Sequence, residues 1–158
     1  MGIVTFETVV VCALPPSRIF KAVVYNLTDL LTKVMPQVIE SVDVIQGDGG
    51  VGTIRQINFG EGFPFKYVKE RVEAIDEEKL TYSYTVIEGD VLKGVEKVQN
   101  DIKFEASSDG VGTVMTNQSH YYTIGDHQMN EEEVNNGKEK SMALFKALEA
   151  YLLANPDA

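Results

Sequence analysis

The C-terminal stretch NEEEVNNGKEKSMALFKALEAYLLA, residues 130–154, decides what kind of fold this chain can have. Asn130 followed by Glu133 has the spacing of a capping box, and two further glutamates fall in the first turn, where the helix dipole favours acidic side chains. We therefore predict one helix that ends at Leu153 or Ala154. It spans about 24 residues, or about 36 Å, which is enough to cross the face of a small sheet.

The two halves of this helix differ in what they can bury. The C-terminal half carries a dense apolar stripe, made of Leu144, Phe145, Leu148, Tyr151 and Leu152. The N-terminal half offers fewer and smaller side chains to the same side, namely Val134, Gly137, Ser141 and Met142. We expect only the C-terminal half to seal a dry core.

Ahead of the helix, the chain has the pattern of an antiparallel sheet. Residues 3–12 are rich in Val, Thr and Phe and predict a strand, and two short helices are expected at 17–25 and 28–34. From residue 38 to 122 one strand follows another, starting with 38–46. Turn-forming residues separate these strands at 47–50, 60–62, 76–78, 89–94 and 107–110. The pattern predicts an α+β fold with two short helices and one long one.

Alternating side chains show which face of the sheet is buried. The clearest strand alternates Val98, Asn100, Ile102 and Phe104 with polar residues. By the same rule, Tyr82 and Tyr84 face inward, as do Arg55, Ile57 and Phe59. The strand that begins with Phe65 and Tyr67 is expected to face them inward, but its alternation is lost at Lys69 and Arg71, so its second half cannot be assigned.

A single long helix is about 10 Å wide and cannot cover a curved sheet unless bulky side chains fill the remaining space. We infer an internal cavity between the sheet and the small residues of the helix. Its expected walls are Ile57, Phe59, Phe65, Tyr67, Tyr82, Tyr84, Asn100 and Ile102, mostly apolar with a few polar groups, as in small-molecule pockets. A packed core with tyrosine hydroxyls at its rim is the alternative, and the pattern alone leaves both open.

Composition narrows the classes of function. The chain has 158 residues, 44% of them apolar, and a formal net charge of −10. This length predicts one domain, residues 1–158, and the negative charge disfavours nucleic-acid and anionic-membrane partners. The single cysteine, Cys12, is expected to be buried. No apolar run reaches the roughly 20 residues that span a bilayer, and we expect a cytoplasmic protein.

Several motifs in register resemble one family. They are GDGGVGT at 47–53, EGFPFKYVK at 61–69, YSY at 82–84, VIEGD at 86–90 and YLLA at 151–154. Together with the order of the elements, they make the whole chain similar to the plant class 10 pathogenesis-related proteins, the family of the major birch-pollen allergen. The resemblance implies the helix-grip fold, a curved seven-stranded antiparallel sheet around the long helix, with a large cavity.

The resemblance also implies a function. Members of this family are described as stress-induced intracellular proteins that bind flavonoids, cytokinins, brassinosteroid-like sterols and fatty acids. Expected partners are therefore small hydrophobic plant metabolites or hormones, bound by a monomer without a cofactor. The positions that match ligand contacts are Ile57, Phe59, Phe65, Tyr67, Tyr82, Tyr84, Asn100, Ile102, Lys138 and Ser141, with Arg55 where the family usually has Lys. Met142 and Phe145 of the helix complete the predicted ligand-binding set.

The glycine-rich loop and the two histidines have simple structural interpretations. The glycines Gly47, Gly49, Gly50 and Gly52 invite a phosphate-binding interpretation, but no Lys-Ser or Lys-Thr follows the last one, so we predict a hairpin loop. His120 and His127 are not spaced as a metal pair, and we predict no metal site.

An enzyme is the alternative function. Ribonuclease activity credited to the family has been attributed to positions that match Glu96, Glu149 and Tyr151. RNA cleavage needs cationic stabilisation that a chain of this charge supplies poorly. The related enzyme norcoclaurine synthase depends on a lysine whose matching position here is Thr116. We therefore favour a binding protein over an enzyme that transforms RNA or a metabolite.

Overall fold

The computed structural model describes residues 2–61, 65–89, 92, 94–126 and 131–156. Within the helices, the side chains that lie outside the description are those of Thr28, Glu133, Val134, Asn136, Gly137, Lys140 and Ser141. The predicted cap at Asn130 and the histidine His127 also lie outside the described residues.

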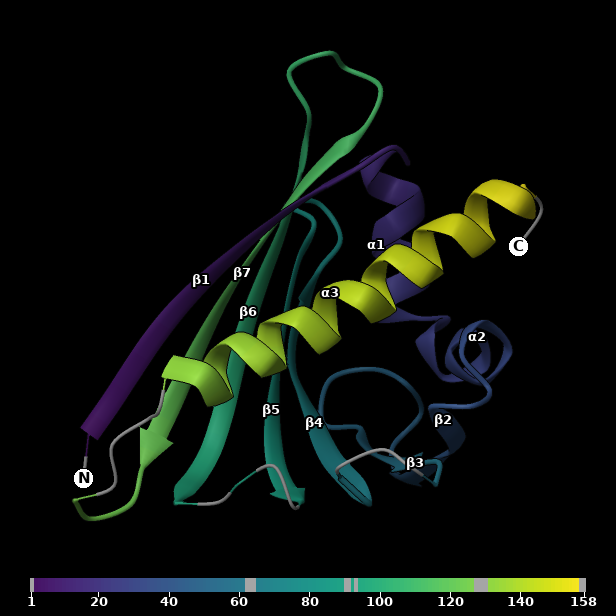
Figure 1. Cartoon of the computed structure of the whole chain (residues 1–158). Helices are drawn as coiled ribbons and strands as arrows, with labels where there is room; N and C mark the ends of the chain where they lie inside the picture. The colour runs from purple at the N-terminus through teal and green to yellow at the C-terminus, as the bar shows by residue number, and fades with distance from the viewer. Residues whose placement is uncertain (1, 62–64, 90–91, 93, 127–130, 157–158) are drawn as a thin grey trace.

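The described strands form one curved antiparallel sheet of seven strands in the order β1-β7-β6-β5-β4-β3-β2 (Figure 1). Their bounds are β1 Gly2–Cys12, β2 Ile39–Gln46, β3 Ile54–Phe59, β4 Tyr67–Asp76, β5 Thr81–Gly89, β6 Val95–Ala106 and β7 Thr113–Thr123. Strands β2 to β7 follow one another as a meander, and β1 closes the order by pairing with β7. The predicted sheet is confirmed.

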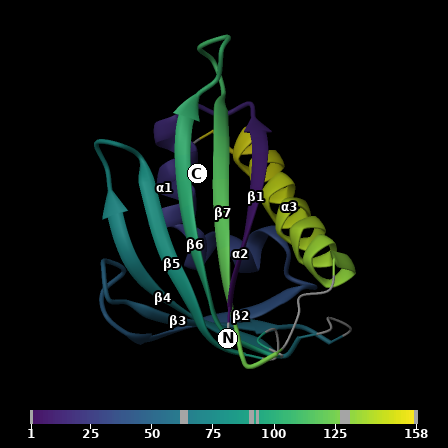
Figure 2. The same ribbon diagram turned by 90° about the vertical axis from the view of Figure 1, so that its left-hand side faces the viewer.

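Three helices lie on one side of this sheet (Figures 1 and 2). They are α1 Pro16–Val24, α2 Leu27–Val34 and α3 Glu131–Ala154. Pro16 occupies the first turn of α1, where a missing backbone N–H costs nothing, and Pro15 is extended ahead of it. The long helix α3 runs diagonally across the concave face (Figure 1).

Polar contacts hold the C-terminal half of α3 in place. Arg18 of α1 donates from Nη2 to the carbonyl oxygens of Leu152 (2.7 Å) and Asn155 (3.0 Å), which satisfies groups that a helix end leaves without partners. Lys146 donates to the carbonyl oxygen of Val11 on edge strand β1 at 2.9 Å. This half of the helix is therefore fixed both to α1 and to the sheet edge.

Buried apolar residues form two clusters. The first, the α1 cluster, joins α1 and the C-terminal half of α3 to the sheet, and it includes Ile19, Phe20, Phe104, Leu148 and Leu152. The second, the α2 cluster, consists of Leu31, Ile39, Ile57 and Val68, with Leu144 of α3 packed against it. Among the described side chains, buried apolar residues thus cover the sheet at two places.

The strand faces follow the predicted alternation in β5 and β6. Val98, Asn100, Ile102 and Phe104 are buried, and Tyr82 and Tyr84 pair across β5 and β6 with Ile102 and Asn100. For β4, the prediction of which residues face inward was wrong. Val68 pairs with Ile57 on the concave face, so Tyr67, opposite Asn58, faces the other way. In β4–β5, the register shifts between Lys69 and Glu70 and between Val72 and Ala74.

The glycine loop joins β2 to β3. Three of its glycines have positive φ angles: 97° at Gly47, 102° at Gly49 and 91° at Gly52. Its amides are used internally, because Gly49 N donates to Thr53 Oγ1 (2.9 Å) and Gly52 N donates to Val72 O (2.8 Å). These two donors are therefore used within the protein, one by Thr53 and one by β4, rather than by an anion.

A pair of substitutions tests why this loop needs glycine. A Cβ at Gly47 would lie 2.7 Å from Thr53 Cα, whereas a Cβ at Gly49 would meet nothing within 4 Å. We expect Gly49→Ala to destabilise the fold by about 1–2 kcal/mol from its backbone conformation alone, and Gly47→Ala by roughly a further 1–3 kcal/mol from the clash. Urea unfolding of both variants measures this difference, and equal losses would contradict it.

Candidate functional site

The candidate site is the concave face of the sheet beneath α3. The structure brings seven of the predicted residues onto this face from three strands: Arg55, Ile57 and Phe59 of β3, Tyr82 and Tyr84 of β5, and Asn100 and Ile102 of β6. Phe145 of α3 is buried in the α1 cluster with Tyr82 and Ile102. These residues therefore share one interior, as the alternation of the strands predicted.

A buried charged group lies in this interior. The Arg55 residue is 5% exposed, and its Nη2 donates to the hydroxyl of Tyr82 at 2.8 Å. The same Nη2 lies 3.5 Å from Oε2 of Glu70, the neighbour of Arg55 across β3 and β4. Arg55 Nε is buried and has no hydrogen-bond partner among the described residues. The guanidinium thus retains a donor that no described residue uses.

Burial shifts the pKa values of the groups around Arg55. Desolvation raises the pKa of Glu70, and the Arg55 charge opposes this shift. Desolvation also raises the pKa of Tyr82 to about 12, even though Arg55 favours the phenolate. The pKa of Tyr84 is raised well above its usual value by desolvation and by the nearby Glu70 carboxylate. Both tyrosines therefore remain neutral hydrogen-bonding groups at physiological pH.

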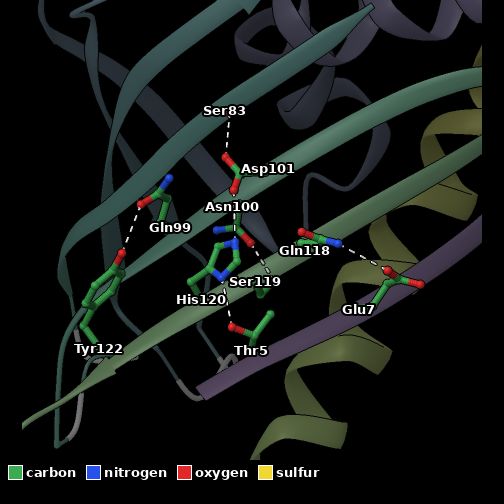
Figure 3. Close-up of polar contacts among 10 residues, drawn as sticks. All are labelled: Thr5, Glu7, Ser83, Gln99, Asn100, Asp101, Gln118, Ser119, His120 and Tyr122. Atoms are coloured by element: carbon green, nitrogen blue, oxygen red, sulfur yellow. Dashed lines mark hydrogen bonds and ion pairs between the residues drawn. The ribbon is translucent and has the colours of Figure 1, made fainter. Parts of the chain in front are cut away.

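A second set of polar side chains lies farther along the concave face, on β6 and β7. Ser119 donates from Oγ to Asn100 Oδ1 at 2.7 Å (Figure 3). Oδ1 of Asn117 is buried without a hydrogen-bond partner among the described residues. Tyr121 pairs with Val98 on the same face, and burial raises its pKa. Hydroxyl and amide groups thus converge here, next to apolar walls.

The polar region on β6 and β7 is incompletely covered. Asn117, Ser119 and Tyr121 are all half-buried, although they share the concave face with residues that are more than nine-tenths buried. These three residues therefore keep solvent-accessible surface on the face that α3 crosses.

Other predicted ligand residues lie elsewhere. Phe65 and Tyr67 line an open surface pocket of about 590 Å³ beside β2 and β3, which Phe59 also borders, and Tyr67 donates to exposed Glu88 at 2.8 Å. Lys138 donates to the Glu7 carbonyl oxygen on the edge of β1 at 3.3 Å. Met142 is 38% exposed. The Ser141 side chain lies outside the described residues.

Sequence reasoning missed Glu70 and the polar groups of β7. Val68, Glu70 and Val72 alternate inward, out of phase with the aromatic residues Phe65 and Tyr67 before them. An arginine on a buried face was the available signal, because a buried cation needs an acidic or polar partner. Ser119 and Tyr121 face inward because they pair with Asn100 and Val98 of β6. Alternation along β7 could have indicated them.

The ribonuclease residues are not brought together. Glu149 accepts from the Ala13 N–H just after β1 at 2.8 Å, beside the end of β6. Glu96 lies at the opposite end of β6, so roughly 30 Å of strand separates the two carboxylates. Tyr151 is two residues from Glu149 on the helix and so faces another direction. No acid–base pair can form from this trio.

The outer face of the sheet holds a separate polar network (Figure 3). His120 Nε2 lies 3.0 Å from Asp101 Oδ2, and His120 Nδ1 lies 3.0 Å from Thr5 Oγ1. Asp101 also accepts from Ser83 Oγ at 2.7 Å. The network ties four neighbouring strands together. Thr116, opposite Val9, lies on this outer face too and is no part of the interior.

The described residues hold neither a metal cluster nor a membrane-spanning helix. Among the residues that the structure describes, no three His, Cys, Asp or Glu side chains gather as a metal ion would need. In the described part of the chain, no helix is both long and apolar enough to cross a bilayer. Cys12 is a buried free thiol, as predicted, and burial raises its pKa.

A curved seven-stranded sheet that holds one long helix defines a helix-grip protein with a partly polar interior. The model of the pathogenesis-related protein Bet v 1 family matches residues 1–155, and the chain therefore belongs to this family. Major allergen Pru ar 1 of Prunus armeniaca is 50% identical over 159 residues, covering 100% of this chain and 99% of that protein. Major allergen Mal d 1 of Malus domestica is 45% identical over the same shares.

Solved structures agree with this assignment. The crystal structure of Ara h 8.0201 matches with a TM-score of 0.87 and 34% identity, covering 98% of this chain and 100% of that one. Norcoclaurine synthase from Thalictrum flavum, solved in complex with dopamine and hydroxybenzaldehyde, matches with a TM-score of 0.74 and 23% identity, covering 98% and 88%. The second likeness shows the shared fold alone.

Removing the Tyr82 hydroxyl tests the buried polar contact. Tyr82→Phe leaves Arg55 Nη2 without its 2.8 Å acceptor, and we expect a loss of about 1–3 kcal/mol in the free energy of unfolding. Tyr122→Phe is the control, because its hydroxyl makes a longer, 3.3 Å bond to Gln99 on the outer face. Denaturant unfolding compares the two, and similar losses in both variants would contradict a special role for the Arg55 contact.

A pH series tests how the Glu149 carboxylate holds α3 to the chain just after β1. Burial opposes ionisation of Glu149, but hydrogen bonds from Ala13 N–H and Cys12, together with Lys146, outweigh it and lower the pKa. A lowered pKa stabilises the fold above the unfolded-state value near 4.5, and the benefit is lost as pH falls through the folded-state value. Glu149→Gln should therefore cost about 1 kcal/mol at neutral pH and little in acid.

The control for this series is Glu96→Gln, because Glu96 is exposed. Its unfolding free energy should stay within about 0.5 kcal/mol of wild type at every pH. A constant loss for Glu149→Gln across the pH range would show that the ionised carboxylate is not what anchors the helix.

Proposed function

We propose that this protein binds small hydrophobic metabolites in a cavity between the concave face of the sheet and the N-terminal half of α3. One observation carries the proposal: the inward-facing residues Asn117, Ser119 and Tyr121 are only half-buried. Close-packed interiors do not leave such side chains accessible. Space beside them supports a ligand-holding interior.

The chemistry of this interior indicates the class of ligand. Ile57, Phe59 and Val98 supply apolar surface, and burial of ligand surface contributes roughly 25 cal/mol per Å². The hydroxyls of Tyr84 and Tyr121 and the Asn100 amide can orient polar ends. This combination suits flat or elongated molecules with a few polar groups, such as flavonoids, cytokinins and brassinosteroid-like sterols, and fatty acids by their chains.

Family membership supports a role in plant stress and defence, with the protein acting as a cytoplasmic monomer that stores or carries its ligand. Norcoclaurine synthase, a protein of this fold, accommodates two small aromatic molecules, dopamine and hydroxybenzaldehyde. We extend only the capacity for such molecules to this chain, and not the reaction, because the position that matches the catalytic lysine of that enzyme is Thr116, which has no basic group.

Titration with N-phenyl-1-naphthylamine, an uncharged dye that fluoresces in apolar surroundings, tests the proposal. We expect a dissociation constant near 1 μM, or about −8 kcal/mol, and displacement of the dye by at least one of a flavonoid, a cytokinin and a sterol. Ser119→Trp should fill the interior and weaken dye binding about tenfold or more.

Gln118→Trp is the matched control, because Gln118 is the neighbouring residue, exposed on the outer face. It should bind the dye like wild type. Absence of dye binding by the wild type, or equal effects of the two tryptophans, would refute binding in this interior.

A further inference from the structure

The buried ion pair bears on which ligands the interior accepts. Arg55 is always charged at physiological pH, and it lies on the concave face with Glu70 as its only acidic partner among the described residues. The side chains are 7% and 12% exposed, so both groups have lost most of their contact with bulk water. When Glu70 is ionised, this part of the interior holds one positive and one negative charge and is neutral overall.

The charges of Arg55 and Glu70 decide which ligand groups can be buried beside the pair. An anionic ligand would place a second negative charge next to Glu70 in a poorly solvated region, and the two anions would compete for one guanidinium. An uncharged acceptor, such as a ketone, ether or phenol oxygen, adds no charge. It can take up the donor capacity that Arg55 retains, since Nε has no hydrogen-bond partner among the described residues.

We propose that the Arg55–Glu70 pair makes this interior selective for ligands whose buried polar end is an uncharged hydrogen-bond acceptor, and selective against ligands that bury a carboxylate or sulfonate. The inference rests on the proposed function and narrows it. A fatty acid would then bind only with its carboxylate at the solvent end. Glu70 is the specificity-determining residue, because without it Arg55 would be an unpaired cation that attracts anions.

Two dyes that differ by one group test the selectivity. N-phenyl-1-naphthylamine is neutral, and 8-anilinonaphthalene-1-sulfonate carries the same rings with a permanent negative charge. We expect the wild type to bind the neutral dye more tightly. Glu70→Gln should shift the ratio of the two dissociation constants toward the sulfonate by about tenfold or more, because Arg55 loses its counter-charge.

Glu73→Gln is the control. It makes the same chemical change on the same strand and removes the same net charge, but Glu73 pairs with Arg71 away from Arg55. Its ratio should equal that of the wild type. In Arg55→Gln/Glu70→Gln, the gain in sulfonate binding should disappear. An unchanged ratio in Glu70→Gln, or the same shift in Glu73→Gln, would overturn the inference while leaving neutral-dye binding, and with it the proposed function, intact.

If Glu70→Gln does not fold, the wild type itself provides the test. The groups that face Glu70 are Arg55 from β3 and Tyr82 and Tyr84 from β5, with Tyr121 of β7 near Tyr84, and the raised pKa values of the three tyrosines keep them neutral in mild acid. Since burial raises the pKa of Glu70, lowering the pH neutralises it while the sulfonate stays charged.

At high ionic strength, which screens the surface charges, sulfonate affinity should rise relative to neutral-dye affinity as the pH falls. A ratio that does not change with pH would count against the selectivity. Failure of the wild type to bind the neutral dye at all would instead reject the proposed function.

Discussion

The structure depends on a mismatch between one helix and a sheet that is too broad for it. α3 is fixed at its C-terminal half, where Arg18 holds the helix end, Lys146 holds the edge of β1, and Phe145, Leu148 and Leu152 are buried. Elsewhere on the concave face, the side chains that would complete a dry core are replaced by asparagine, serine and tyrosine. The C-terminal half of α3 is therefore buried, while inward-facing polar residues of β7 stay half-buried.

The second feature is the set of polar groups in the interior, which follows from the incomplete cover of the sheet by α3. Polar groups in an interior need partners, and here Arg55 finds Tyr82 and Glu70, while Ser119 finds Asn100. Arg55 Nε and Asn117 Oδ1 are buried without a hydrogen-bond partner in the described part of the chain. In a protein that holds ligands, such atoms are places where an incoming polar group can contribute binding energy.

Much of this arrangement could be predicted from local patterns. Alternation placed the faces of β5 and β6, and the apolar stripe of residues 144–152 placed the anchored half of α3, because both signals have a fixed period. The pairing of Arg55 with Glu70 could not be predicted, since it depends on the register between β3 and β4. The phase of β4 was missed because the alternation was counted from Phe65 and Tyr67, whereas the inward run begins at Val68. The separation of Glu96 from Glu149 also depends on how distant segments meet.

The central claim is that a ligand lies against the concave faces of β6 and β7, under the N-terminal half of α3. Intermolecular nuclear Overhauser effects between bound N-phenyl-1-naphthylamine and the protein test it most directly. The account predicts contacts to Tyr84, Ser119 and Tyr121, with none to Phe65 or Tyr67 at the surface pocket beside β2 and β3. Contacts confined to that pocket, or to the outer face around His120, would contradict it.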